Sequence, residues 1–166
     1  MNTGRTLARY PYRRYGTPAL AFATMFTDAV FSCPALRVNQ ALSKHVPVYA
    51  FEFNDPQAAT LLRSPGDLPG LGSHHSSSLA YAFQAPVAGL ADPAQFTPAQ
   101  RALSDAFSGA WMTFVKTANP NPSGSAWAPF ATARGNVQAF TPTGVRPALN
   151  FAADHQCDYW LPLNLP

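Results

Sequence analysis

The sequence carries little charge and lacks several features that mark common classes of protein. Asp, Glu, Lys and Arg make up 11% of its 166 residues, whereas typical globular domains have about 25%. No uninterrupted run of about 18 apolar residues is present, so the sequence predicts no membrane span. Hydrophobic residues nevertheless account for 47% of the chain, which predicts a folded core and argues against disorder.

Basic residues are too few and too scattered for a nucleic-acid-binding face. The chain has only two lysines, Lys44 and Lys116, and four of its arginines lie within the first 14 residues. Binding to nucleic acid normally uses a continuous stripe of Lys and Arg on a recognisable module. We therefore expect no nucleic-acid partner.

Turn-forming residues limit the length of the expected elements, and the N-terminal region is also considered as a signal peptide. The 17 prolines and 10 glycines predict many turns and short elements, which argues against a helical bundle or coiled coil. Arg13 and Arg14 precede an apolar run over 17–26, which has the length of a signal-peptide core. Aromatic residues interrupt the basic region, and Asp28 closes the run without a cleavage site. We expect a buried helix here and find no convincing signal peptide.

Periodicity and turn signals predict a mixed set of elements. The expected elements are an irregular lead-in at 1–16, a helix in two parts over 17–44, a strand at 48–53, a long loop at 54–78, a short apolar segment at 79–83, a helix at 98–117, a strand at 136–140 and a helix at 151–160. Thr27 or Asp28 is expected to cap the second part of the first helix. The strand at 48–53 is apolar almost throughout, which predicts burial on both faces.

These elements do not form a complete layered domain. Thr97 and Gln100 predict a capping box at the start of the helix over 98–117. Its residues Leu103, Phe107 and Trp111 form part of a wide apolar stripe that needs a sheet to cover. The strands expected here are too few for that sheet. The sequence therefore predicts a single partial domain over 1–166.

Histidine is the only residue type that suggests chemistry. His74 and His75 are adjacent in the long loop, and such a doublet can be solvated and without function. Neighbouring histidines rarely point at one ion and His155 is distant in sequence, so no metal site is predicted. His75 is a candidate general base for a nucleophilic hydrolase.

The rest of such a catalytic set is missing from the sequence. No G-x-S-x-G nucleophile elbow and no run of three glycines for an oxyanion hole occur in the 166 residues. The serines beside His75 are expected not to replace the nucleophile, because a sequence neighbour generally cannot reach the ring nitrogen that faces a substrate.

The segment around the histidines resembles a known motif. Residues 71–83 (LGSHHSSSLAYAF) are similar to the histidine motif of the type-B carboxylesterases, the cholinesterase-like branch of the α/β-hydrolases. That motif reads G-x-x-H-[small]-x-[E/D]-[L/I]-x-[aromatic]-V-F. It places the catalytic histidine at His75, with Leu79, Tyr81 and Phe83 at matching offsets. Ser78 stands where the family has an acidic residue that would help orient the histidine loop.

Other family motifs follow in the same order over nearly the whole chain. The matching segments are 27–37 (TDAVFSCPALR) with T-D-x-x-F-x-C-P, 48–53 (VYAFEF) with V-Y-x-Y-x-F, 103–121 with L-S-x-x-x-x-x-x-W-x-x-F-x-x-T-G-x-P-N, 127–130 with W-P-x-[Y/F], and 157–160 (CDYW) with C-x-[F/Y]-W. The resemblance implies the C-terminal portion of an α/β-hydrolase fold, with few strands and several covering helices. This portion is incomplete as a stand-alone domain.

The resemblance also implies a disulfide and a cellular environment. Cysteines of the C-P and C-x-[F/Y]-W motifs are bonded in the family, and they correspond to Cys33 and Cys157. Without the resemblance, two buried thiols explain the same residues. A disulfide would place the full-length protein in an oxidising compartment, secreted or periplasmic, although the location of this chain itself is left open.

The function that the resemblance implies is serine-dependent ester hydrolysis. His75 would supply the triad histidine, while the serine, the oxyanion glycines and the acid lie upstream in the family. The chain alone is expected to be inactive, and an ester would be its substrate only once the domain is complete. No cofactor is expected. Two alternatives remain: a non-catalytic interaction module, and a truncated remnant. The sequence does not fix ester specificity or oligomeric state.

Overall fold

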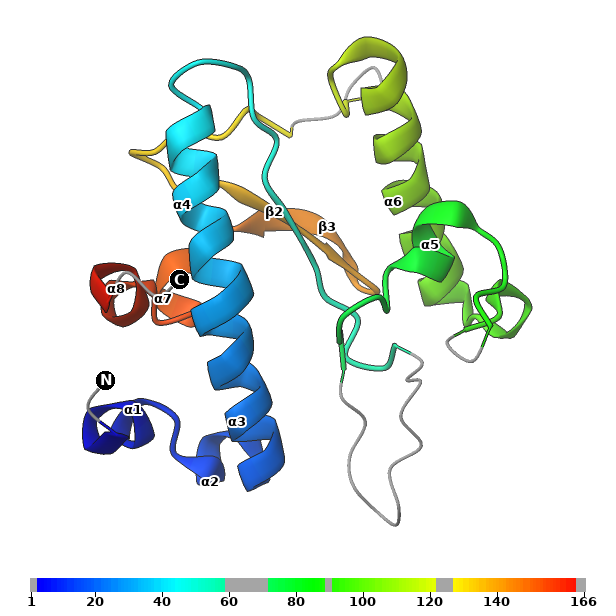
Figure 1. Cartoon of the computed structure of the whole chain (residues 1–166). Helices are drawn as coiled ribbons and strands as arrows, with labels where there is room; N and C mark the ends of the chain where they lie inside the picture. The colour runs from blue at the N-terminus through cyan, green and yellow to red at the C-terminus, as the bar shows by residue number, and fades with distance from the viewer. Residues whose placement is uncertain (1–2, 59–71, 89–90, 122–126, 164–166) are drawn as a thin grey trace. The chain divides into compact units, whose positions relative to one another are not determined.

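The computed structural model describes residues 3–58, 72–88, 91–121 and 127–163, which divide into two compact units (Figure 1). Unit 1 consists of Met1–Val48, Phe130–Asn136 and Leu149–Pro166. Unit 2 consists of Tyr49–Pro129 and Val137–Ala148 and contains the whole sheet. The central part of the long loop predicted at 54–78 lies outside the described residues.

A long helix organises unit 1. It runs through α3 (Pro18–Thr27), the π-helical turn η1 (Asp28–Ser32) and α4 (Cys33–Leu42). The predicted two-part helix is confirmed, and its proline lies in the first turn of α4. The predicted cap at Thr27 or Asp28 is wrong, because both residues are helical and neither makes a side-chain capping bond there. Asp28 is fully buried, and its carboxylate instead contacts the side chains of Tyr10 and His155.

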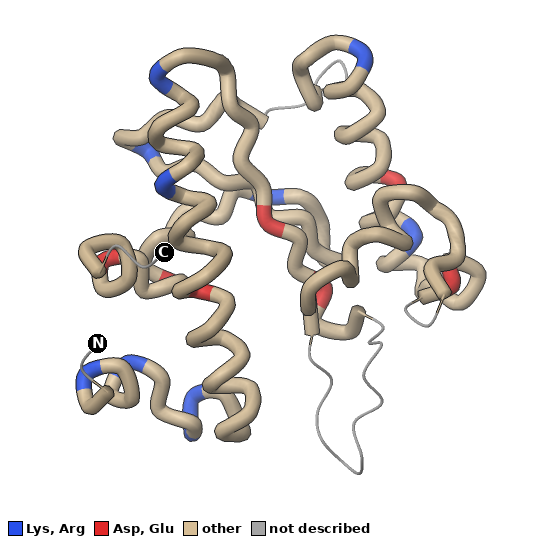
Figure 2. Tube along the Cα trace, viewed as in Figure 1, with Lys and Arg blue, Asp and Glu red and all other residues tan. Residues whose placement is uncertain are grey.

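This helix is also the most apolar part of the chain. Between Pro18 and Leu42 its only charged residues are Asp28 and Arg37 (Figure 2). Its 25 residues have a mean hydropathy of 1.5 over the most apolar stretch, enough by length and composition to cross a membrane. The predicted absence of a membrane span is therefore not confirmed.

Short helices at the two chain ends meet in unit 1. The lead-in predicted to be irregular instead forms α1 (Thr3–Arg9) and α2 (Tyr12–Tyr15). The predicted helix at 151–160 is broken into α7 (Phe151–Asp154) and α8 (Cys157–Trp160), followed by the turn η3 (Leu161–Leu163). The break falls at Gln156, whose φ of 53° is left-handed.

Side-chain contacts explain why the lead-in is helical. The guanidinium of Arg9 lies 3.0 Å from the carboxylate of Asp158, and the hydroxyls of Thr6 and Tyr159 are 2.7 Å apart. Contacts between segments so distant in sequence favour a helix that propensity alone does not predict. The disulfide implied by the family resemblance is present: Cys33 and Cys157 are bonded, with Cα atoms 5.3 Å apart.

A three-stranded mixed sheet forms the centre of unit 2. Strand β1 (Phe51–Phe53) pairs in parallel with β2 (Val137–Thr141), which forms an antiparallel hairpin with β3 (Gly144–Ala148). The strands predicted at 48–53 and 136–140 are confirmed in place, although β1 is shorter, and β3 was not predicted. Burial of the first strand on both faces was wrong, because Phe51 is 39% exposed.

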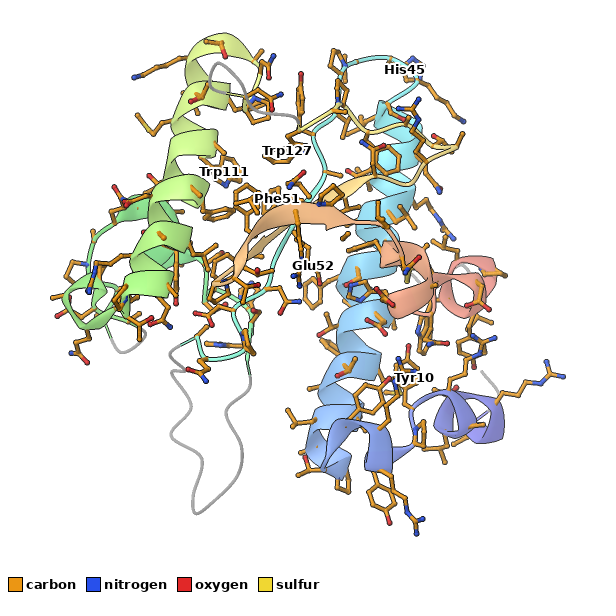
Figure 3. The ribbon with its side chains drawn as sticks, turned by 180° about the vertical axis from the view of Figure 1, so that it is seen from behind. Tyr10, His45, Phe51, Glu52, Trp111 and Trp127 are labelled. Atoms are coloured by element: carbon orange, nitrogen blue, oxygen red, sulfur yellow. A yellow bond between two sulfur atoms is a disulfide. The ribbon has the colours of Figure 1, made fainter. Side chains whose placement is uncertain are left out.

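Helices of unit 2 pack on this sheet. The long helix α6 (Pro98–Thr117) has its predicted bounds and its predicted capping box between Thr97 and Gln100. With α5 (Leu79–Phe83) and the turn η2 (Pro93–Gln95), it closes over a core made of Ala80, Tyr81, Phe96, Leu103, Phe107, Ala110 and Phe140. Trp111 belongs to the predicted apolar stripe, yet it is 44% exposed. Phe51 contacts both Trp111 and Trp127 edge to face (Figure 3).

Candidate functional site

The candidate base His75 lies in unit 2, in the segment that leads into α5. Its side chain is exposed, and Nδ1 lies 3.0 Å from the hydroxyl oxygen of Ser76. In a catalytic triad Nδ1 faces the orienting acid, while Nε2 faces the nucleophile. Ser76 therefore occupies the position of the acid relative to the ring. Its φ of 71° bends the backbone sharply at this point.

The neighbouring His74 is placed differently. Its ring is partly buried, and Nδ1 lies 3.1 Å from the backbone oxygen of Gly72. Its Nε2 is buried and has no hydrogen-bond partner among the described residues. The interpretation of the doublet as two solvated side chains is therefore wrong for His74. The two rings have different hydrogen-bond partners.

Ser78 stands where the family resemblance expects an acidic residue. It is the N-cap of α5, but its side chain accepts no capping hydrogen bond. The histidine segment is instead held by its own turns, in which Ser77 N donates to His74 O and Leu79 N donates to Ser76 O.

A buried carboxylate outside the histidine motif anchors this segment. Asp55 is 1% exposed, and its Oδ2 accepts from the Tyr81 hydroxyl at 2.5 Å and from Gln100 Nε2 at 2.9 Å. Its Oδ1 accepts from the backbone of Gln57, and its backbone oxygen accepts from the Ser73 hydroxyl at 3.0 Å. Asp55 thus contacts the chain both before and after the histidines.

Burial raises the pKa of Tyr81, the tyrosine that donates to Asp55. Desolvation raises the pKa of the Tyr81 phenol well above its usual value of about 10, and the hydrogen bond to Asp55 raises it further. Ser104 on α6 donates to the backbone oxygen of Tyr81 at 2.9 Å. The histidine segment is therefore tied to the end of β1, to α5 and to α6.

The sequence analysis missed Asp55 because it placed this residue only in the long loop at 54–78. The available signal was an acidic side chain directly after a strand, where functional side chains often lie in α/β folds. Tyr81 was singled out only as a motif match. The predicted disulfide, by contrast, lies in unit 1. Among the residues described, no group of three or more His, Cys, Asp or Glu side chains is placed to hold a metal ion.

Comparison with known proteins gives matches along nearly all of this chain. A model of the carboxylesterase family matches residues 6–160. Human bile salt-activated lipase is 32% identical over 113 residues, which cover 64% of this chain and 14% of the lipase. Rabbit cocaine esterase is 31% identical over 105 residues, covering 63% and 19%. The chain thus spans less than a fifth of the length of these relatives.

Solved structures agree on the fold. A PNB esterase superposes with a TM-score of 0.63 at 22% identity, covering 92% of this chain and 30% of the esterase. A thermophilic PNB esterase gives 0.65 at 21% identity, covering 92% and 29%. These enzymes are α/β-hydrolases, so the structure has the fold of one part of that architecture, as predicted. The family match over 6–160 shows that the chain belongs to the carboxylesterase family.

Proposed function

We propose that this chain is the histidine-bearing C-terminal segment of a serine carboxylic-ester hydrolase, with His75 as the general base. The observation that carries the proposal is the exposed position of His75 on a segment anchored to the buried Asp55. The family match runs from residue 6 to residue 160, and so includes parts of both units. This supports the further proposal that the two units belong to one partial domain.

The proposed role of His75 follows from its ring contacts. When Nδ1–H donates to Ser76, Nε2 carries the lone pair that a general base needs. In the completed enzyme, Nε2 would take the proton of a serine hydroxyl as that serine attacks an ester carbonyl. His75 would then return the proton to the leaving alcohol and activate water to release the acyl group. None of these steps uses a metal or an organic cofactor.

We propose that the chain alone does not supply this cycle, because its sequence has neither the G-x-S-x-G motif nor a run of three glycines. An ester is therefore the proposed substrate of the completed domain. The relatives' names, a lipase and a cocaine esterase, differ in substrate and give no single specificity to transfer. The Cys33–Cys157 disulfide supports a secreted or periplasmic location for the full-length protein.

A second candidate function is a non-catalytic interaction module with the same fold. The observation that favours it is Ser78, which stands in place of the family's acidic residue and makes no side-chain capping bond. The truncated remnant, the third alternative, predicts a chain that exposes its apolar surface and binds hydrophobic dye.

One experiment separates the enzyme from these alternatives. The DNA upstream of the codon for residue 1 is read in all frames, and the longest frame that continues into this chain is expressed. Hydrolysis of p-nitrophenyl acetate is then measured for the wild type, His75→Ala and His74→Ala. We expect kcat to fall by about 10³-fold or more in His75→Ala, since a triad member is removed.

His74→Ala is the matched control, and it should keep kcat within about tenfold. Equal losses in the two variants would refute the assignment of His75. An upstream frame without G-x-S-x-G, or a full-length protein without esterase activity, would favour the interaction module.

A further inference from the structure

Unit 2 contains a cavity of about 380 Å³ between α6 and the β2–β3 hairpin. This volume lies within the range of small-molecule sites, which is about 300–1,000 Å³. The described residues that line it all belong to unit 2. None of them comes from the histidine segment at 72–79.

Small residues on α6 leave this space open. Ala106, Gly109 and Ala110 line the helix side, three and four residues apart, and so share one face of the helix. A Cβ atom added to Gly109 would meet no other atom within 4 Å. The helix therefore borders open space where a larger side chain would normally pack against the sheet.

The opposite wall comes from alternate residues of the hairpin. Gln138 and Phe140 share one face of β2, and their cross-strand partners Pro147 and Val145 lie on the same face of β3. Trp127 completes this wall, with its ring centroid 5.5 Å from that of Phe140 (Figure 3). The cavity is thus largely apolar, with aromatic rings on one side.

This wall also carries polar groups. The indole Nε1 of Trp127 is buried without a hydrogen-bond partner among the described residues. Gln138 lies on the central strand and is only 9% exposed, and its backbone N–H donates to Ala50 O. Its side-chain carboxamide has no hydrogen-bond partner among the residues that the structure describes. The Gln138 carboxamide is not fully enclosed, unlike Trp127 Nε1, so water or a ligand can be its hydrogen-bond partner. The cavity is the space from which that partner can come.

We propose that this cavity binds a small neutral alcohol with an aromatic or alicyclic body. A hydroxyl group both donates and accepts a hydrogen bond, which matches the two functions of the Gln138 carboxamide. The rings of Trp127 and Phe140 favour a flat apolar body. This proposal rests on unit 2 alone and does not depend on the proposed ester hydrolysis.

Charge argues for a neutral ligand. The one charged residue among the described lining residues, Asp105, is exposed and already accepts a hydrogen bond from Gln84 Nε2 at 2.8 Å. An anionic head group would be repelled by this carboxylate. A cationic head group would gain little from it, because water screens the attraction of an exposed charge.

The test uses benzyl alcohol as the probe and toluene as its match without the hydroxyl. Each is titrated into the ¹⁵N-labelled chain while the side-chain amide of Gln138 and the indole N–H of Trp127 are followed by NMR. We expect benzyl alcohol to shift both signals and to bind more tightly than toluene. In Gln138→Leu, the affinity for benzyl alcohol should fall about threefold to tenfold, the size of one neutral hydrogen bond, while that for toluene stays within about twofold.

A second variant fills the cavity without touching its polar group. Gly109→Leu projects a side chain into the open space and should abolish binding of both probes while the Gln138 signal persists. Gly109→Leu also tests the proposal if Gln138→Leu fails to fold. The proposal is overturned if benzyl alcohol leaves the wild-type signals unchanged, if Gln138→Leu weakens both probes equally, or if Gly109→Leu binds both as the wild type does.

Discussion

The Tyr81 hydroxyl donates to the buried carboxylate of Asp55 over 2.5 Å, and this bond joins the end of β1 to the start of α5. Removing the hydroxyl in Tyr81→Phe leaves a buried charge with one donor fewer. Because hydrogen bonds to charged groups contribute about 1.5–3 kcal/mol, we expect the free energy of unfolding to fall by about that amount. Guanidinium denaturation followed by tryptophan fluorescence measures the loss.

Tyr49→Phe is the matched control in the same unit. The Tyr49 ring contacts Phe114 and Trp127, so the substitution keeps the packing and should change stability by less than about 0.5 kcal/mol. Tyr81→Phe should also speed hydrogen exchange of the Ser77 and Leu79 amides, which close the turns of the histidine segment. A destabilised protein with unchanged exchange at these amides would show that Asp55 does not hold the segment.

Alkaline pH should destabilise both units through their buried tyrosines. Desolvation raises the pKa of Tyr10 in unit 1 and of Tyr81 in unit 2 above the unfolded value of about 10. Above that pH the unfolded chain loses these protons first, so the folded state binds more protons and its stability falls as pH rises. Each tyrosine contributes a slope of up to about 1.4 kcal/mol per pH unit.

Denaturation midpoints between pH 9 and pH 12 measure this slope. Tyr10→Phe and Tyr81→Phe should each reduce it. Tyr12→Phe serves as control because Tyr12 is 52% exposed in the folded chain. A slope equal in all three variants would mean that burial of these phenols does not control the alkaline limit.

The sequence was most informative where a local signal matched the final packing. Thr97 and Gln100 predicted the start of α6 because a capping box is formed within one helical turn. Motif resemblance predicted the disulfide, although its cysteines are 124 positions apart. Both cases rest on patterns that are readable without knowing the neighbouring elements.

The predictions that failed concern elements that depend on contacts between distant segments of the chain. The helix α1 and the broken C-terminal helix depend on contacts between chain ends, such as Arg9 with Asp158, which no local pattern contains. Strand β3 contains Pro147, which argues against a strand, but the register places it opposite Gln138 on the outer strand of the hairpin. Asp55 was missed as an anchor because its partners Tyr81 and Gln100 come from two later elements.

Loss of the Cys33–Cys157 disulfide should destabilise unit 1 selectively. Chain-entropy estimates for a loop of this length predict that the disulfide stabilises the folded state by about 4–5 kcal/mol. This is an upper value, because the calculation ignores strain in the folded state. In the double variant Cys33→Ser with Cys157→Ser, amides of α4 and α8 should exchange faster, while those of α6 in unit 2 stay protected. Hydrogen exchange with mass spectrometry resolves the two units.

Alkylation of the native wild type provides the complementary measurement. Iodoacetamide without a reductant should modify neither Cys33 nor Cys157, and adding a reductant should lower the stability of the wild type but not that of the double serine variant. Adducts on the unreduced native protein would contradict the disulfide.

Asp28 should be the most sensitive carboxylate of unit 1, because three aromatic or heteroaromatic side chains depend on it. It is fully buried in the π-helical turn, where Oδ2 accepts from the Tyr10 hydroxyl at 2.9 Å and Oδ1 lies 2.6 Å from His155 Nδ1. The same Tyr10 hydroxyl accepts from Trp160 Nε1 at 2.6 Å. Asp28→Asn removes the negative charge that directs these donors, and we expect a loss of about 1–3 kcal/mol.

The control for this prediction is Asp154→Asn, which makes the same change at an exposed site of the same unit and should alter stability by less than about 0.5 kcal/mol. A purely local effect of Asp28→Asn would leave Trp160 unchanged. If the carboxylate instead sets the direction of the Tyr10 hydroxyl, the bond from Trp160 weakens and the NMR signal of its indole proton shifts upfield. Equal stability losses in the two variants, or an unmoved Trp160 signal, would refute a network centred on Asp28. A larger stability loss in Asp28→Asn together with a shifted Trp160 signal would explain why the long helix has one buried acid among apolar residues. The carboxylate joins η1 to both ends of the chain.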